Sequence, residues 1–253
     1  MASNFVNITK RKYILVLSDS RGKCLEVVWS ENYQQKYPLI KLEVVTQPGA
    51  TLQKLIETAT EKYHQNFYDH IIVQGGICNL TVKLYNKGLY WLHYYRDTQV
   101  EDIIELIRNS KEQIKCMSFA NIAPASLVKY FEINNGHGPE NKLKLLQEQQ
   151  ANLLEDINTI NHSIEEGNKI SGHRTIDLDR HLVSKKRKRK GGASTRVSKF
   201  TDTHLTDGIH PDNYLMEKWH HRTCSSIITQ LEFESATETS DSDLDSWNFK
   251  RRK

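Results

Sequence analysis

The chain has 253 residues, and 38% of them are hydrophobic, which suits one α/β domain with polar tails. The formal net charge is +4, but residues 185–190 read KKRKRK, and without these six charges the rest of the chain carries −2. Because the basic residues form one block, composition argues against a nucleic-acid surface that spans the domain. No apolar run reaches the roughly 20 residues that a membrane helix needs.

Short apolar runs alternate with amphipathic segments along the chain. The runs predict strands at residues 13–17, 41–45, 70–74, 114–122 and 174–178. The amphipathic segments predict helices at residues 21–35, 52–63, 102–108 and 141–167, and a last helix that starts at Pro211. This alternation predicts a parallel sheet of about five strands with helices on both faces, a three-layer α/β/α sandwich.

Changes in composition set the expected limits of the domain. We expect an N-terminal tail at residues 1–11 and one α/β domain over residues 12–230. Inside the domain, residues 184–200 combine basic residues with Gly, Ser and Thr, which predicts a flexible basic loop. Residues 232–246 are rich in Ser, Thr, Asp and Glu, so a disordered C-terminal tail is expected over residues 231–253.

The cysteines indicate a reducing compartment. Cys24, Cys78, Cys116 and Cys224 are scattered and form no CxxC pair, which favours free thiols and gives no support to a zinc site. The first residues, MASNFVNITKRK, lack the apolar stretch of a signal peptide. We therefore expect an intracellular protein, in the nucleus or the cytoplasm, that uses no metal or other cofactor.

Two distant segments contain the residue types of a nucleophilic acyl-transfer site. Ser20 follows the apolar run of the first predicted strand, and Asp207 and His210 lie three positions apart in the segment DGIHP. A serine nucleophile, a histidine base and an orienting aspartate form a catalytic triad when the fold brings them together. Each segment alone is typical of an ordinary turn or helix start, so the hypothesis depends on their combination.

Four short segments over residues 12–230 resemble the sequence blocks of the SGNH hydrolase family, also called GDSL-type esterases. The family's GDS turn reads SDS here, which makes Ser20 the nucleophile candidate and puts Ser18 at the usual glycine position. Gly49 in QPGAT matches the second block, GGICN occupies the place of the third, and DGIHP matches the fourth in full, with Asp207 and His210. The resemblance implies a divergent member with a flavodoxin-like α/β/α fold.

The third block differs from the family's GxND pattern. The usual alignment puts Cys78 at the position of the asparagine that binds the oxyanion, and Asn79 at the following aspartate. A thiol is a weaker hydrogen-bond donor than an amide. A shift of one residue in the turn would let Asn79 serve instead. Cys78 itself is interpreted as a small buried thiol or, alternatively, as a second nucleophile or redox switch.

The resemblance implies a serine esterase or acyl hydrolase that cleaves an ester or acetyl group of a small molecule. Its triad would be Ser20, Asp207 and His210, and its oxyanion hole would use Ser20, Gly49 and Cys78 or Asn79. The alternative is a catalytically weak or inactive SGNH-like domain that serves as a binding or accessory module, either in the nucleus or derived from a mobile element or virus. A third hypothesis is a nucleic-acid binder that depends on the basic loop.

The basic block itself has three interpretations. Residues 185–190 fit a solvated charged loop, a signal for a nuclear import receptor, or a contact to nucleic-acid phosphates. No aromatic residues interleave with the block to stack on bases, so a nucleic-acid partner is the least favoured of the three. A mobile basic lid that steers anionic substrates is a further hypothesis, because the block lies shortly before Asp207.

Overall fold

The computed structural model describes residues 8, 10–95, 99–136, 139–190 and 193–250. Four parallel strands form the central sheet, in the order β2-β1-β3-β6. The strands are β1 (Lys12–Ser18), β2 (Ile40–Thr46), β3 (His70–Gln74) and β6 (Met117–Phe119). β1 and β3 each contain an uninterrupted aliphatic run, at residues 14–17 and 71–73, as expected of strands that are covered on both faces.

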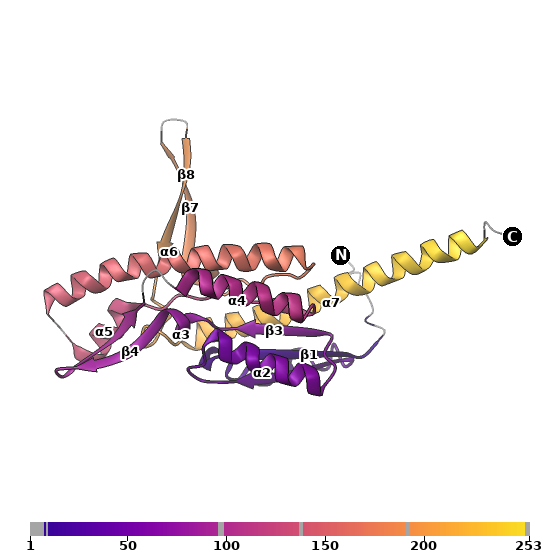
Figure 1. Ribbon diagram of the computed structural model, residues 1–253, viewed down its shortest axis with the longest axis horizontal. Helices are drawn as coiled ribbons and strands as arrows, with labels where there is room; N and C mark the ends of the chain where they lie inside the picture. The colour runs from indigo at the N-terminus through magenta and orange to yellow at the C-terminus, as the bar shows by residue number, and fades with distance from the viewer. Residues whose placement is uncertain (1–7, 9, 96–98, 137–138, 191–192, 251–253) are drawn as a thin grey trace.

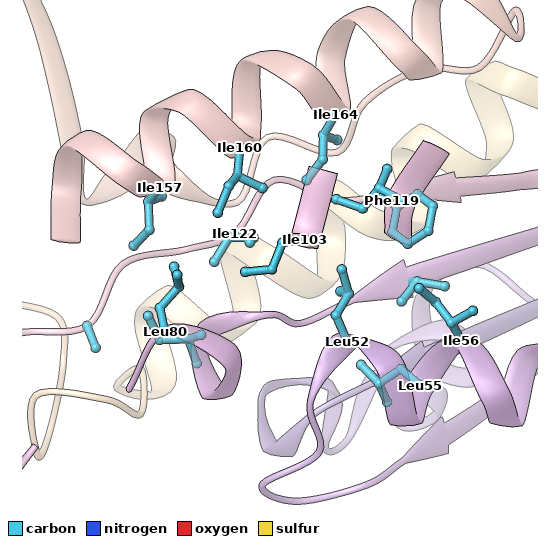
Figure 2. Packing of buried hydrophobic residues seen from close by; sticks show 14 of the residues in the cluster. Leu52, Leu55, Ile56, Leu80, Ile103, Phe119, Ile122, Ile157, Ile160 and Ile164 are labelled. Atoms are coloured by element: carbon cyan, nitrogen blue, oxygen red, sulfur yellow. The ribbon is translucent and has the colours of Figure 1, made fainter. Parts of the chain in front are cut away.

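Alternate residues of β1 pack into two separate cores, one on each face of the sheet. Leu15 and Leu17 belong to the core beneath α2 (Leu52–Gln65), α4 (Gln99–Gln113) and α6 (Glu140–Ile170). Figure 2 shows side chains from these three helices packing together in that core.

Ile14 and Val16 face the opposite core, which includes residues of α1 (Leu25–Asn32) and α7 (Asn213–Lys250). This period of two is the side-chain alternation of a strand. It gives the predicted three-layer α/β/α sandwich.

Two antiparallel hairpins and several short helices complete the fold. The first hairpin joins β4 (Thr81–Asn86) to β5 (Leu89–Tyr94) and follows the short helix α3 (Ile77–Leu80). The helix α5 (Leu127–Asn135) contacts β5. The second hairpin, β7 (Val183–Lys190) with β8 (Ala193–Phe200), projects away from the body in Figure 1.

The structure differs from the sequence-based expectation in several segments. Residues 184–190 and 193–200 lie in the paired strands β7 and β8, whereas the composition of residues 184–200 predicts a flexible loop. Residues 231–250 continue helix α7, where a disordered tail was expected, and residues 232–246 contain no glycine or proline to interrupt a helix. The predicted helix at residues 21–35 is shorter, since α1 covers only Leu25–Asn32, and a separate 3₁₀ turn at Ser20–Gly22 precedes it.

The predicted fifth strand, residues 174–178, does not join the sheet, which has four strands. The Ile176 carbonyl oxygen accepts one backbone hydrogen bond, from Asn121 at 2.9 Å. The Arg174 amide instead donates to the side chain of Gln230 in α7, at 3.0 Å. The backbone amide of Arg174 is therefore bonded to a side chain and not to a neighbouring strand. Among the described residues, no helix is both long and apolar enough to cross a membrane.

Candidate active site

Ser20 lies immediately beyond the carboxyl end of β1. Asp19 caps the short 3₁₀ turn Ser20–Gly22, because its carboxylate accepts a hydrogen bond from the Arg21 amide at 2.9 Å. The Asp19 amide donates to the Gln74 carbonyl oxygen at the end of β3, at 3.1 Å. These bonds hold the turn at the edge of the sheet where ligands bind in open α/β folds.

The DGIHP segment is held in a tight turn by its own aspartate. One oxygen of Asp207 accepts hydrogen bonds from the amides of Ile209, at 2.9 Å, and His210, at 2.7 Å. Gly208 has a φ of +84°, and a β-carbon there would lie 2.5 Å from the Ser126 carbonyl oxygen. Only glycine fits this conformation and this close approach.

The fold brings the three candidate triad residues together over a separation of 190 positions. His210 Nδ1 lies 2.8 Å from the second oxygen of Asp207, and His210 Nε2 lies 3.2 Å from Ser20 Oγ. The side chains of His210 and Asp207 remain 39% and 35% exposed, so a substrate can reach them. This chain of hydrogen bonds has the geometry of a nucleophile, a base and an orienting acid.

The surroundings of Asp207 keep its carboxyl group ionised. Partial burial acts to raise the pKa of Asp207, but hydrogen bonds from the backbone and ring of His210 and from the Ile209 amide outweigh it. The pKa of Asp207 therefore lies below its ordinary value. A carboxylate in this position fixes the proton of His210 on Nδ1 and leaves Nε2 free to accept one from Ser20.

Arg21 is a buried site residue that the sequence analysis did not single out. Its side chain is nearly covered, and its two terminal nitrogens donate to the carbonyl oxygens of Ala123, at 2.7 Å, and Ile209, at 3.4 Å. The guanidinium carbon lies 5.8 Å from the ring centre of Trp219. The only sequence signal for this role was an arginine directly after Ser20.

The remaining predicted site residues follow β2 and β3. Gly49 lies in an exposed turn after β2, with a φ of +75° that favours glycine. Cys78 and Asn79 lie in α3, directly after β3. The Asn79 side-chain oxygen accepts a hydrogen bond from the Leu52 amide at 2.7 Å. Asn79 thus uses its carbonyl oxygen to support the start of α2.

Solved structures match most of the chain, although no protein-family model and no curated protein does. A lipase/acylhydrolase from Enterococcus faecalis is 12% identical, and the match covers 88% of this chain and 97% of that one, with a TM-score of 0.55. A GDSL-like lipase from Bacteroides thetaiotaomicron, also 12% identical, covers 88% and 89% with a TM-score of 0.54. The chain has the SGNH-hydrolase fold. The acetyl xylan esterase AlAXEase, at 10% identity, covers 85% and 99% with a TM-score of 0.54.

One departure from the SGNH sequence pattern has a steric counterpart nearby. Ser18, at the usual glycine position, is fully buried at the end of β1. A β-carbon at Gly22 would lie 2.3 Å from Ser18 Cβ, closer than two such carbons can approach. The missing side chain at Gly22 therefore makes the room that Ser18 occupies.

The other departure is Cys78, at the usual asparagine position of the SGNH pattern. Burial raises the pKa of the Cys78 thiol, and the charge of Asp19 raises it further, against smaller opposing effects of Arg21 and Lys83. The thiol is therefore protonated at neutral pH, which argues against a thiolate nucleophile. In the described part of the chain, no group of three or more His, Cys, Asp or Glu residues is arranged to hold a metal ion.

Proposed function

We propose that the chain is an SGNH-type serine hydrolase that cleaves an ester or acetyl group of a small molecule. The observation that carries this proposal is the chain of hydrogen bonds from Ser20 through His210 to Asp207 at the carboxyl edge of the sheet. Structural similarity to a lipase/acylhydrolase and to an acetyl xylan esterase agrees with this substrate class.

In the proposed first step, Ser20 Oγ attacks the carbonyl carbon of the substrate. His210 Nε2 takes the hydroxyl proton as the new C–O bond forms, and the carbonyl π electrons move to the oxygen. The Asp207 carboxylate stabilises the resulting imidazolium. The tetrahedral intermediate then releases the alcohol, which leaves with the proton from His210, and the acyl group stays on Ser20.

In the second step, water replaces the alcohol. His210 accepts a proton from the water molecule as its oxygen attacks the acyl carbon of the ester on Ser20. The second tetrahedral intermediate expels Ser20 Oγ, which recovers its proton from His210. The carboxylic acid product leaves, and no external oxidant, reductant or metal takes part in this sequence.

The proposed oxyanion hole relies on backbone donors. The amides of Ser20 and Gly49 follow β1 and β2, which are neighbours in the sheet, so both can point to an oxyanion above the carboxyl edge. Cys78 would supply a weak third donor in place of an amide. Because one good donor contributes about 10²–10³ in turnover, we expect slow hydrolysis relative to an SGNH enzyme with asparagine there.

A fluorophosphonate probe tests the proposal without knowledge of the substrate. The probe phosphonylates an activated serine, so we expect one label on the full chain, located on Ser20 by peptide mass spectrometry. The Ser20→Ala variant should remain unlabelled, whereas Ser30→Ala, which changes an exposed serine in α1, should label like the wild type. A folded wild-type protein that takes no label would refute the hydrolase proposal.

The second candidate is a binding module with a weak or inactive SGNH site. The position of Cys78 favours it, because a protonated, partly buried thiol is a poor replacement for an amide donor. A binding module would show no labelling of Ser20, and would still bind a carboxylate product or an ester analogue in the same site. The basic segment at residues 185–190 stays a separate prediction about localisation.

A further inference from the structure

A small cavity lies behind the Ser20 turn, between the carboxyl edge of the sheet and α7. Its lining includes Ser18 from β1, Asn121 after β6, and Trp219 and His220 from α7. Arg21, from the 3₁₀ turn that contains Ser20, also lines it. The space open to the centre of a water-sized molecule is about 10 Å³. That volume corresponds to about one water molecule.

Five buried polar atoms of this lining have no hydrogen-bond partner among the described residues. They are Ser18 Oγ, Arg21 Nε, Asn121 Oδ1, Trp219 Nε1 and His220 Nε2. Their residues are between 0% and 7% exposed, so bulk water does not reach these atoms. Unpaired buried polar groups are rare in folded proteins, and here five of them belong to residues that line one small space.

The five atoms include both donors and acceptors. Arg21 Nε and Trp219 Nε1 can only donate, and Asn121 Oδ1 can only accept. Burial lowers the pKa of His220, although a hydrogen bond to the Arg21 backbone opposes this, so the ring is neutral at neutral pH. Because Nε2 has no partner, Nδ1 makes that bond as the donor, and His220 Nε2 is an acceptor. The Ser18 hydroxyl can do either.

We propose that this cavity binds one ordered water molecule. The water would accept hydrogen bonds from Arg21 Nε and Trp219 Nε1, and donate to Asn121 Oδ1 and to either His220 Nε2 or Ser18 Oγ. Two donors and two acceptors match the four hydrogen bonds of water. An anion would face the lone pairs of Asn121 and His220, and a cation would face the guanidinium, so a neutral ligand of mixed polarity fits best.

The water would connect the scaffold to the candidate triad through Arg21. Its partners come from β1, from the segment after β6 and from α7, which are far apart in the sequence. Arg21 uses its other nitrogens to hold the carbonyl oxygens of Ala123 and Ile209, and Ile209 precedes His210. The water thereby limits the movement of Arg21 relative to the His210 segment. Only this last consequence, and not the water site, rests on the proposed function.

A crystal structure of the full chain at a resolution that reveals ordered water tests the site directly. We expect a density peak within about 2.7–3.2 Å of Arg21 Nε and Trp219 Nε1. An empty cavity would overturn the proposal. A peak that gains anomalous signal after a bromide soak would also overturn it, because the site would then bind an anion.

Oxygen-17 relaxation dispersion of the solvent counts long-lived internal waters in solution. Asn121→Leu replaces the acceptor by a methyl group of similar volume, and should remove one such water. Asn32→Leu, a change at an exposed residue of α1, should keep the wild-type count. Should Asn121→Leu fail to fold, Ser18→Val fills the cavity from β1 and should remove the same water. An unchanged count in a folded variant contradicts the proposal, and the count does not depend on catalysis or on labelling of Ser20.

Discussion

The Arg21 guanidinium donates a hydrogen bond to the carbonyl oxygen of Ile209 at 3.4 Å. Arg21 directly follows Ser20 and Ile209 directly precedes His210, so this bond connects the two segments that supply the proposed nucleophile and the proposed base. The same guanidinium donates a second hydrogen bond, to the carbonyl oxygen of Ala123, at 2.7 Å. The distance between Ser20 and His210 therefore depends on a residue outside the triad.

Replacement of Arg21 should slow the reaction of Ser20 more than it weakens substrate binding. Lysine in Arg21→Lys lacks the planar fork that reaches two carbonyl oxygens. We expect the rate of fluorophosphonate labelling and kcat to fall by about 10- to 100-fold through misplacement of His210, with a smaller change in KM. Arg222→Lys is the matched control, because Arg222 also donates to a carbonyl oxygen, that of Asp177, at 3.1 Å. Equal decreases in labelling rate and kcat for Arg21→Lys and Arg222→Lys would rule out a positioning role for Arg21.

Two His–Asp pairs of similar geometry allow a controlled test of the base. His210 lies 2.8 Å from Asp207, and His204 lies 2.8 Å from Asp212, with similar exposure. We expect His210→Ala to lower hydrolysis of a small activated ester by about 10²- to 10⁴-fold, the usual contribution of a general base. His204→Ala should leave the rate within about twofold of wild type. Stopped assays with purified protein measure both, and comparable losses would contradict the assigned role of His210.

Acid should remove the stabilising effect of the Asp207 charge. The folded state lowers the pKa of Asp207, so its contribution to stability is present above the ordinary pKa of about 3.9. It is lost as the pH falls through the lowered folded value. Asp207→Asn should therefore reduce the free energy of unfolding at pH 7 more than at pH 3. Urea unfolding at the two pH values measures the difference, and an equal effect at both would show that charge is not involved.

The substitution Cys78→Asn should strengthen the oxyanion hole. An amide at this position adds the donor that the thiol supplies only weakly, so hydrolysis of a small activated ester should rise by about 10- to 1,000-fold. Adding Ser20→Ala should abolish the gain. A folded variant without any rise would mean that the site is limited elsewhere. Activity that survives Ser20→Ala would exclude Ser20 as the nucleophile.

The basic block should direct the protein to the nucleus if it binds an import receptor. We expect alanine replacement of residues 185–190 to shift a tagged protein from the nucleus to the cytoplasm, as seen by fluorescence microscopy. The chain is 29.4 kDa, small enough to diffuse through nuclear pores, so the tag has to be large. The terminal KRRK, residues 250–253, is replaced in a parallel variant because it can act as a second signal. Nuclear accumulation that persists after both changes would refute the signal.

Local sequence was sufficient for the strands that position the site, but insufficient where side chains or distant segments decide the structure. β1 and β3 were predictable because both are short aliphatic runs that end in polar turns. The predicted strand at residues 114–122 is longer than β6, which ends at Phe119. Beyond that point the Ile122 amide donates a hydrogen bond to the side-chain oxygen of Asn161, at 2.7 Å, and not to a neighbouring strand. No local pattern encodes such a partner.

The candidate site shows the same division. Ser20, Asp207 and His210 stand in recognisable local contexts, and their types match a known chemistry. Arg21 does not, because its partners are the backbone carbonyl groups of Ala123 and Ile209, which every residue carries. The β7–β8 hairpin was also missed, because composition describes the charge of residues 184–200 but not their pairing.

The close contact between Ser18 and Gly22 makes the residues tolerated at the two positions depend on each other. Side chains at both positions would clash, since a β-carbon at residue 22 would lie 2.3 Å from Ser18 Cβ. A side chain at residue 22 would therefore require glycine, without a β-carbon, at residue 18. Ser18 is fully buried, so Ser18→Gly alone would leave a gap in the interior, whereas Gly22→Ala alone would produce a clash.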